Sequence, residues 1–372
     1  KEVIHSALQG PDTITGANIA YDFGCLVARH PELLPLVWKA YEDGRVFDVL
    51  ISATLDAIYG GRLTDGELFD RKGKKISAGR YSLKSVRADY VGGEDAKKND
   101  RWRLSYALLE DTPIDQWPED ARQYPIDDVT NTLLVAEKLL SEAHNLHNLS
   151  FQNHAAFCMH LGSIWGMRVD TERALALKSE VDGHLETIHE FAKAHNLLKL
   201  GGTKKAPKWT ADTKYQKELV FKAYDGLPPS TETGEISLSK ETLEESGDPV
   251  LVKYAEGSKW KKLRTYADTL VSFGTKPMNV EVNPILSTGR ASYRGLIQLM
   301  PKKGGVRECF IARDGYAFCS VDYAAVELST YAQVQLWTLG RSKLAEVINS
   351  GKDPHSAFAA EMTNDDYERF VK

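Results

Sequence analysis

The sequence predicts a multidomain protein that combines an α/β part with an α+β part. At 372 residues the chain is longer than one hydrophobic core usually supports, so two or three domains are expected. Short apolar runs are followed by helical spacing near both ends of the chain, around Gly16 and around Asp322. The stretch between them is dominated by helical periodicity over residues 154–273.

Residues 1–149 form the first predicted domain. An apolar strand candidate before Gly16 leads into a helical segment that contains Asp22, and a strongly periodic helix containing Asp128 is predicted to open near residue 124. Each aspartate alone suits an ordinary role, Asp22 as a helix cap and Asp128 as a partner of a helix dipole. Residues 61–99 are rich in Gly, Lys, Asp and Arg and indicate a loop or hairpin without identifiable chemistry.

Residues 150–279 form the second predicted domain, which is mostly helical. A polar stretch over residues 201–208 interrupts the helical pattern. A long helix is predicted over residues 250–270. Three of its side chains recur at helical spacing on one face, namely Lys259, Lys262 and Tyr266.

Residues 280–372 form the third predicted domain. The apolar run 317–321 indicates a buried strand, Asp322 follows at its end, and residues 324–336 have helical spacing. Two roles compete for Asp322. An aspartate at this position commonly caps the following helix. A carboxylate at a strand end can instead bind Mg²⁺ for phosphoryl transfer.

Charge is distributed unevenly along the chain. The formal net charge of −5 argues weakly against nucleic-acid binding. Residues 259–307 nevertheless contain two acidic residues, Asp268 and Glu281, and these ten basic ones: Lys259, Lys261, Lys262, Arg264, Lys276, Arg290, Arg294, Lys302, Lys303 and Arg307. Phosphate binding requires such a local excess. A solvated helix face would explain residues 259–264 alone, but it explains the whole stretch less well.

Composition bears on the compartment. No apolar run approaches the roughly 18 residues that a membrane helix needs, and the N-terminus has no secretory pattern. The four cysteines lack metal-binding spacing and are expected to be buried, reduced thiols. We therefore expect a protein without a membrane partner, in a cytosol-like compartment.

Four ordered blocks carry a resemblance to a known family. Residues 322–328, Asp-Tyr-Ala-Ala-Val-Glu-Leu, resemble motif A of the family A DNA polymerases, Asp-Tyr-Ser-Gln-Ile-Glu-Leu-Arg. Residues 288–292, 296–301 and 306–312 are similar to the family's Thr-Gly-Arg-Leu-Ser, Asn-Leu-Gln-Asn-Ile-Pro and Ile-Arg-x-x-Phe blocks. One block alone would carry little weight, whereas four in the family's order are specific.

The resemblance implies a right-hand polymerase of bacterial or bacteriophage type, located in the cytoplasm of a bacterium or of a phage-infected cell. In such a polymerase, residues 150–279 would be the thumb and residues 280–372 the palm and the start of the fingers. Asp322 and the carbonyl of Tyr323 would hold two Mg²⁺ ions, and Glu327 would exclude a ribose 2′-OH. A primer 3′-OH would attack a deoxynucleoside triphosphate. The residues that would contact primer–template DNA are Lys259, Lys262, Tyr266, Arg290, Gln298 and Arg307.

The first domain resembles the RNase H-like 3′–5′ exonuclease that precedes the polymerase domain in this family. Residues 18–22 and 124–128 are similar to its motifs II and III. The resemblance implies that Asn18 belongs to the exonuclease site. Asp22 and Asp128 would bind Mg²⁺, Mn²⁺ or Zn²⁺, and Tyr124 would orient the attacking water. We expect the two aspartates to lie within bridging reach of one ion.

Parts of the family pattern are missing or changed. The first exonuclease motif, Asp-x-Glu, is absent before Asn18, and Asp170-Thr-Glu172 comes too late and predicts a helix start. We therefore expect no proofreading by this chain. Leu296 and Leu299 replace two Asn residues of the family, and Ser329 replaces the Arg of motif A, which affects template-side contacts.

The fingers helix and the second palm motif, His-Asp-Glu, are not in the sequence. We therefore expect this segment alone to be inactive, and its partners to include a remaining polymerase segment or a processivity factor. An alternative function is that of a non-catalytic DNA-binding module derived from a polymerase. A relative of the single-subunit RNA polymerases is a third, which Glu327 and the exonuclease motifs disfavour.

Overall fold

The computed structural model describes residues 2–64, 66–76, 80–92, 102–142, 148–203, 206–295 and 297–371. The chain divides into two compact units, Lys1–Ala312 and Arg313–Lys372. The three-domain division at residues 149 and 279 stays a prediction. Short 3₁₀ helices occupy Pro31–Leu33, Trp102–Leu104, Tyr106–Leu109, Ile114–Gln116, Ile297–Leu299 and Arg307–Cys309.

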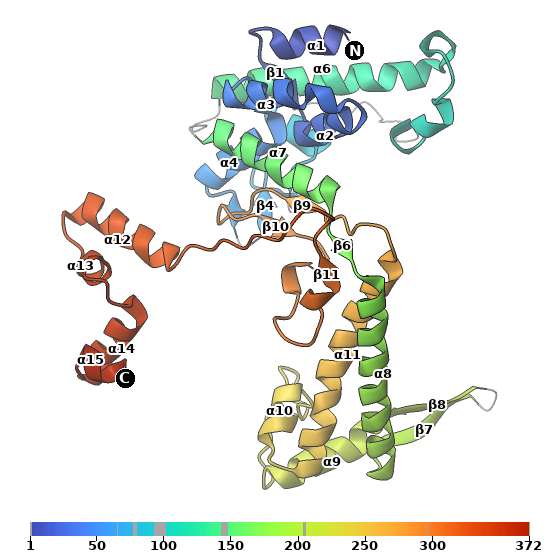
Figure 1. Ribbon diagram of the computed structural model, residues 1–372, viewed down its shortest axis with the longest axis vertical. Helices are drawn as coiled ribbons and strands as arrows, with labels where there is room; N and C mark the ends of the chain where they lie inside the picture. Colours follow the sequence, from blue (N-terminus) through green and yellow to red (C-terminus); the bar gives the residue numbers. More distant parts are fainter. Residues whose placement is uncertain are drawn as a thin grey trace. The chain divides into compact units, whose positions relative to one another are not determined.

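The first half of unit 1 is built on a pair of short parallel strands. β1 (Ile14–Gly16) pairs with β2 (Val46–Asp48), with Ile14 opposite Val46. All three residues of β2 are buried, because helices pack around the pair (Figure 1). These helices are α1 (Glu2–Gln9), α2 (Ile19–Arg29), α3 (Leu34–Glu42), α4 (Val49–Tyr59), α6 (Glu119–Glu142) and α7 (Leu149–Trp165).

Asp48 joins the starts of two helices. It ends β2 and is almost fully buried. Its Oδ1 accepts hydrogen bonds from the N–H groups of Leu50 at 2.8 Å and Ile51 at 3.3 Å, which caps α4. Its Oδ2 accepts the N–H of Ile19, the first residue of α2, at 2.9 Å. Burial raises the pKa of Asp48, and the backbone N–H groups that point at it oppose this change.

Residues 61–92 form a small antiparallel sheet and a helix. Strands β3 (Leu63–Thr64), β4 (Glu67–Phe69) and β5 (Lys75–Ile76) pair in chain order. Ser82 caps α5 (Leu83–Tyr90) through a reciprocal pair of hydrogen bonds with Ser85. The expected hairpin is therefore present, as part of a three-stranded sheet. Residues 65, 77–79 and 93–99 of that predicted stretch lie outside the described residues.

A charged network holds this sheet and α5 to α4. The guanidinium of Arg62 donates to Asp56 Oδ2 at 2.8 Å and to Asp89 Oδ2 at 3.3 Å. The hydroxyl of Tyr81 donates to Asp89, and that of Tyr90 to Asp56, each at 2.6 Å. Burial raises the pKa of both tyrosines, so both are neutral donors. This network was not expected, because the sequence of residues 61–99 indicated no identifiable chemistry.

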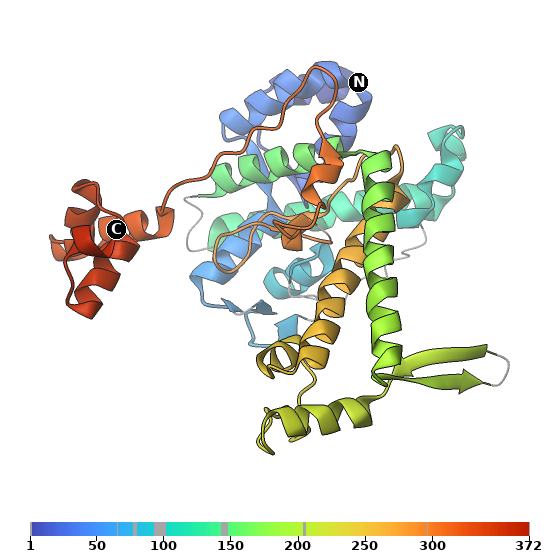
Figure 2. The ribbon, with the colours of Figure 1, turned by 60° about the horizontal axis from the view of Figure 1, so that its bottom comes forward.

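Two long helices organise the second half of unit 1. α8 (Thr171–Ala194) and α11 (Pro249–Phe273) lie side by side in both views (Figures 1 and 2). Asp170 caps α8 and Asp248 caps α11, each through two backbone N–H groups, so the cap role expected for Asp170 is confirmed. The hairpin β7 (Leu198–Thr203) and β8 (Ala206–Ala211), with α9 (Thr213–Ala223) and α10 (Lys240–Glu245), lies at one end of the pair.

Short strands lie at the other end of the helix pair. β6 (Arg168–Val169) pairs with β11 (Phe310–Ile311), and β9 (Val282–Asn283) pairs with β10 (Ser292–Tyr293). The turn before β11 packs directly on the helices through Gly304, whose φ is +100°. A Cβ there would lie 2.8 Å from Leu263 of α11. Only glycine fits both the backbone angle and this close approach.

Unit 2 contains four helices among its described residues: α12 (Val326–Leu339), α13 (Lys343–Asn349), α14 (Pro354–Thr363) and α15 (Tyr367–Phe370). The expectation of a buried strand over residues 317–321 is wrong. These residues have no regular structure and are exposed, and Val321 is 84% exposed. A strand forms only where a neighbouring strand completes its hydrogen bonds, and none of the described residues of unit 2 forms a strand.

Several other expectations differ from the structure in detail. α6 begins at Glu119, five residues before Tyr124. α12 begins at Val326 rather than at residue 324. All four cysteines are free, but Cys309 alone is buried, whereas Cys25, Cys158 and Cys319 are exposed. Among the described residues, no helix is both long and apolar enough to cross a bilayer.

Candidate functional site

The predicted DNA-contacting lysines lie on the exposed side of α11. Lys259 and Lys262 are both exposed, and neither has a carboxylate partner within the described part of the chain. The ammonium of Lys259 lies 4.9 Å from the ring centre of Trp260. Trp260 in turn stacks on His184 of α8 at 3.8 Å. The charge of Lys259 is therefore presented beside an aromatic pair that bridges the two helices.

Neighbouring charges on the same helices are paired. Arg264 of α11 lies 3.1 Å from Asp182 and 3.6 Å from Asp268, and Lys178 of α8 also pairs with both aspartates. The net charge of this cluster is zero. Lys259 and Lys262 consequently contribute more to the electrostatic attraction of a polyanion than Arg264 does.

Tyr266 does not share the exposed face with these lysines, contrary to expectation. It is 6% exposed and belongs to the core between α8 and α11. Its hydroxyl donates to the carbonyl oxygen of Leu299 at 2.6 Å. The physical reason is that residues 263, 266, 267 and 270 all lie on the buried side of the helix. Tyr266 thus ties α11 to the segment that contains Gln298.

Replacing Tyr266 by phenylalanine tests this role. The ring remains, and the hydrogen bond to the Leu299 carbonyl is lost, so we expect the free energy of unfolding to fall by about 1 kcal/mol. The affinity for primer–template DNA should stay unchanged. Urea denaturation and fluorescence anisotropy measure the two quantities. If the Tyr266→Phe variant lost DNA affinity severalfold while its stability stayed unchanged, the hydroxyl of Tyr266 would be a DNA contact after all.

Three further predicted DNA contacts lie in the segment between β9 and β11. Arg290 is exposed in the turn between β9 and β10, beside Gly289, whose φ is +76°. Gln298 uses its Oε1 to accept the N–H of Tyr293 at 2.7 Å, which fixes the segment against β10. Arg307 is exposed, and its guanidinium donates to the carbonyl of Met300 at 3.3 Å. Leu296, one of the residues that depart from the family block, lies outside the described residues.

The residues of the exonuclease-like motifs lie on two helices of unit 1. Asn18 precedes α2 with a left-handed backbone (φ 64°), which asparagine tolerates. Asp22 lies in the first turn of α2 and does not cap it. Its side chain reaches solvent, yet surrounding protein still raises its pKa through desolvation. The bridging of one ion by Asp22 and Asp128 stays a prediction.

Tyr124 and Asp128 are four residues apart on α6, so they share one face of the helix. Tyr106 packs on Tyr124 with ring centres 6.2 Å apart, and its hydroxyl donates to the carbonyl of Ala121 at 2.7 Å. The pKa of Tyr106 is raised, first by burial and then by the nearby Tyr124 and Asp128. Among the described residues, no three His, Cys, Asp or Glu side chains form a group that could hold a metal ion.

Asp322 of unit 2 is neither buried nor a helix cap. The residue that caps α12 is Ala325, with a left-handed backbone (φ 49°) and no side-chain cap. The carboxylate of Asp322 is exposed, as is Tyr323, at 79%. Glu327 lies in the first turn of α12 and is also exposed. The ordinary cap role for Asp322 is therefore wrong, and its carboxylate is accessible to a ligand.

Sequence reasoning missed Asp48, although a signal for it exists. The run Val46-Phe47 is apolar, an aspartate follows, and helix α4 begins at the next residue. This is the same pattern that singled out Asp322.

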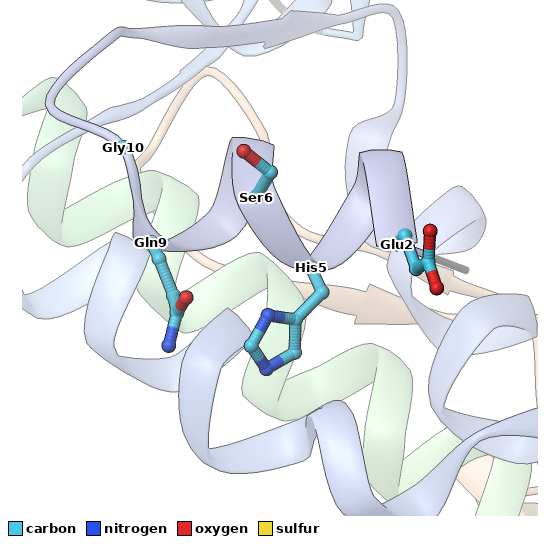
Figure 3. A pocket seen from close by; sticks show the side chains of 5 residues that line it. All are labelled: Glu2, His5, Ser6, Gln9 and Gly10. Atoms are coloured by element: carbon cyan, nitrogen blue, oxygen red, sulfur yellow. The ribbon is translucent and has the colours of Figure 1, made fainter.

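A separate hollow on the surface beside α1 is lined by Glu2, His5, Ser6, Gln9 and Gly10, with His5 and Gln9 on the same side of the helix (Figure 3). It contains none of the predicted site residues.

Comparison with known proteins gives a match in fold. No protein-family model and no curated protein matches the sequence. The chain is similar to the POL domain of Pol1 from M. smegmatis, whose structure is a complex with DNA primer-template and dNTP. The TM-score is 0.54 at 18% sequence identity, and the match covers 87% of this chain and 50% of that chain. The chain thus has the fold of part of a polymerase domain and spans about half the length of this neighbour.

Proposed function

We propose that this chain is part of a family A, template-directed DNA polymerase that works in the cytoplasm of a bacterium or of a phage-infected cell. The fold match to a domain solved with DNA primer-template and dNTP carries the proposal. The four ordered sequence blocks agree with it independently of the fold. The reaction would be transfer of a deoxynucleotide to a primer 3′-OH with release of pyrophosphate.

Asp322 and the main-chain carbonyl of Tyr323 are the proposed ligands of Mg²⁺. Both offer hard oxygen atoms, which Mg²⁺ prefers, and the exposure of the Asp322 side chain fits such a ligand. When bound there, Mg²⁺ would lower the pKa of the primer hydroxyl and neutralise charge on the leaving pyrophosphate. Glu327 would occupy the space that a ribose 2′-OH needs, and so favour deoxynucleotides.

Exposed cations of unit 1 would hold the duplex. Lys259 and Lys262 of α11 and the exposed Arg290 and Arg307 would contact phosphates, which gives affinity without sequence preference. Gln298 would act through the segment that it fixes against β10. Asn18, Asp22, Tyr124 and Asp128 would belong to a 3′–5′ exonuclease-type region that lacks its first carboxylate motif.

The double substitution Lys259→Ala with Lys262→Ala tests the proposal on the 372-residue chain. Loss of two phosphate contacts should weaken binding to a primer–template duplex, and it should reduce the slope of log K against log salt by about 1.8. Fluorescence anisotropy with a labelled duplex at several salt concentrations measures both quantities.

The matched control is Lys72→Ala with Lys74→Ala, which removes the same charge from two exposed lysines between β4 and β5. Like Lys259 and Lys262, they have no carboxylate partner among the described residues. The control should bind the duplex as the unmodified chain does. Equal loss in both variants would point to a nonspecific effect of net charge. Unchanged binding by the α11 variant would contradict the proposed DNA interface.

A further inference from the structure

The hairpin β7–β8 has no role in the function proposed above. It projects from the end of the α8–α11 pair in both views (Figures 1 and 2). Its register places Leu200 opposite Trp209 and Lys199 opposite Thr210. Because side chains alternate along a strand, Leu200 and Trp209 share one face, and Lys199 and Lys208 share the other.

The base of the hairpin is firmly held. Leu197, directly before β7, is fully buried in a core with Val220 and Leu251. Its carbonyl accepts the N–H of Asp212 at 2.9 Å and the side-chain amide of Gln216 at 2.8 Å. The base of the hairpin is therefore held in place next to α8, and this fixes the orientation of the two exposed faces of the hairpin.

The apolar face of the hairpin is largely uncovered. Leu200 is 62% exposed and Trp209 is 40% exposed. The ammonium of Lys193 on α8 lies 5.3 Å from the centre of the indole ring. A two-stranded ribbon gains little stability from an exposed indole. The arrangement of an accessible aromatic ring beside a lysine is typical of surfaces that bind unpaired bases.

The charge of the hairpin restricts the kind of ligand that it can bind. Residues 191–203 and 206–211 contain Lys193, Lys199 and Lys208 and no acidic residue. Glu190 pairs with Lys193 and Asp212 with Lys199, both at the root. Lys208, further out, has no carboxylate partner among the residues that the structure describes. The outer part of the hairpin therefore carries a net positive charge and favours an anionic ligand.

We propose that the β7–β8 hairpin binds a single-stranded segment of nucleic acid. The inference rests on the proposed polymerase function and adds to it a site for an unpaired strand. An unpaired base would stack on Trp209 and Leu200 on one face of the hairpin. The strand would then cross the edge of the hairpin, so that its phosphates reach Lys208 and Lys199 on the opposite face. In a duplex the faces of the bases are covered by their neighbours, so the exposed indole suits a single strand better.

The test uses the 372-residue chain and a fluorescein-labelled oligothymidylate, with affinity measured by anisotropy at several salt concentrations. Trp209→Ala should weaken binding about fivefold or more, the loss of one stacked base. Lys199→Ala with Lys208→Ala should also weaken it and should reduce the salt slope by at least about 0.7, the share of the unpaired Lys208. The control Lys222→Ala removes one exposed charge at the far end of α9 and should bind as the unmodified chain does.

Two outcomes overturn the inference. Unchanged affinity for the single strand in the lysine pair variant would exclude the hairpin as its binding site. Because Lys199 and Lys208 are exposed, this variant keeps its fold even if Trp209→Ala does not, and circular dichroism checks both. Equal weakening for single-stranded and duplex DNA would exclude base stacking. If the hairpin variants bind normally and the Lys259→Ala, Lys262→Ala variant loses duplex binding, the hairpin inference fails and the proposed function stands.

Discussion

Asparagine in place of Asp322 is expected to lower primer extension about a thousandfold or more in the proposed polymerase. The substitution removes the charged oxygen that would ligate Mg²⁺. Metal ligation contributes several kcal/mol to the stabilisation of such a transition state, and about 4 kcal/mol corresponds to a thousandfold. Binding of the primer–template duplex should change little, because Lys259 and Lys262 remain. Single-turnover extension and duplex anisotropy measure the two quantities.

The matched control is Asp365→Asn, which makes the same chemical change at an exposed aspartate of unit 2 and should leave extension unchanged. This experiment also separates the proposed function from the alternative of a non-catalytic DNA-binding module. Full extension activity in the Asp322→Asn variant would refute the catalytic role. A protein that binds the duplex through α11 and never extends a primer would favour the binding module.

Leucine in place of Arg62 is expected to lower the free energy of unfolding of unit 1 by about 3–5 kcal/mol. The side chains of Asp56 and Asp89 are 8% and 2% exposed, and each would lose its cationic partner. The hydroxyls of Tyr81 and Tyr90 would still donate to them, so the carboxylates would keep hydrogen bonds and lose the compensating charge. Urea denaturation followed by circular dichroism measures the loss.

Arg80→Leu serves as the control for Arg62→Leu. Arg80 pairs with Glu281 at 3.2 Å, and both side chains are about half exposed, so the expected cost is below about 1 kcal/mol. Asparagine at both Asp56 and Asp89 in the Arg62→Leu background should restore part of the stability, because the uncompensated charges are then gone. Equal costs for the Arg62 and Arg80 variants would contradict a structural role for the buried network.

The helices of the second half of unit 1 could be predicted from sequence because their periodicity is long and their ends carry strong signals. α11 begins after the Asp248 cap, with Pro249 at its first position, and it closely matches the predicted range 250–270. The hairpin β7–β8 was not predicted. Its Gly201-Gly202 pair and its lysines are typical of a loop, and the pairing of Leu200 with Trp209 depends on a register that periodicity alone does not reveal.

The candidate site was predictable where a motif is local and unpredictable where it depends on packing. Asp322 stands out through its neighbours in the chain, but the strand expected before it did not form, since pairing requires a partner strand. Tyr266 was assigned to the wrong face because helical spacing does not say which face is covered. The Arg62 network joins residues from 56 to 90, and no short pattern marks such a set.

The sharing of the Asp48 carboxylate between α2 and α4 has a consequence for local dynamics. The amides of Ile19, Leu50 and Ile51 all depend on the same two oxygen atoms. Rotation of this one side chain would release the first turns of both helices together, so they form a single cooperative opening unit. Asn18 directly precedes Ile19, so the same opening would also free the loop that contains Asn18.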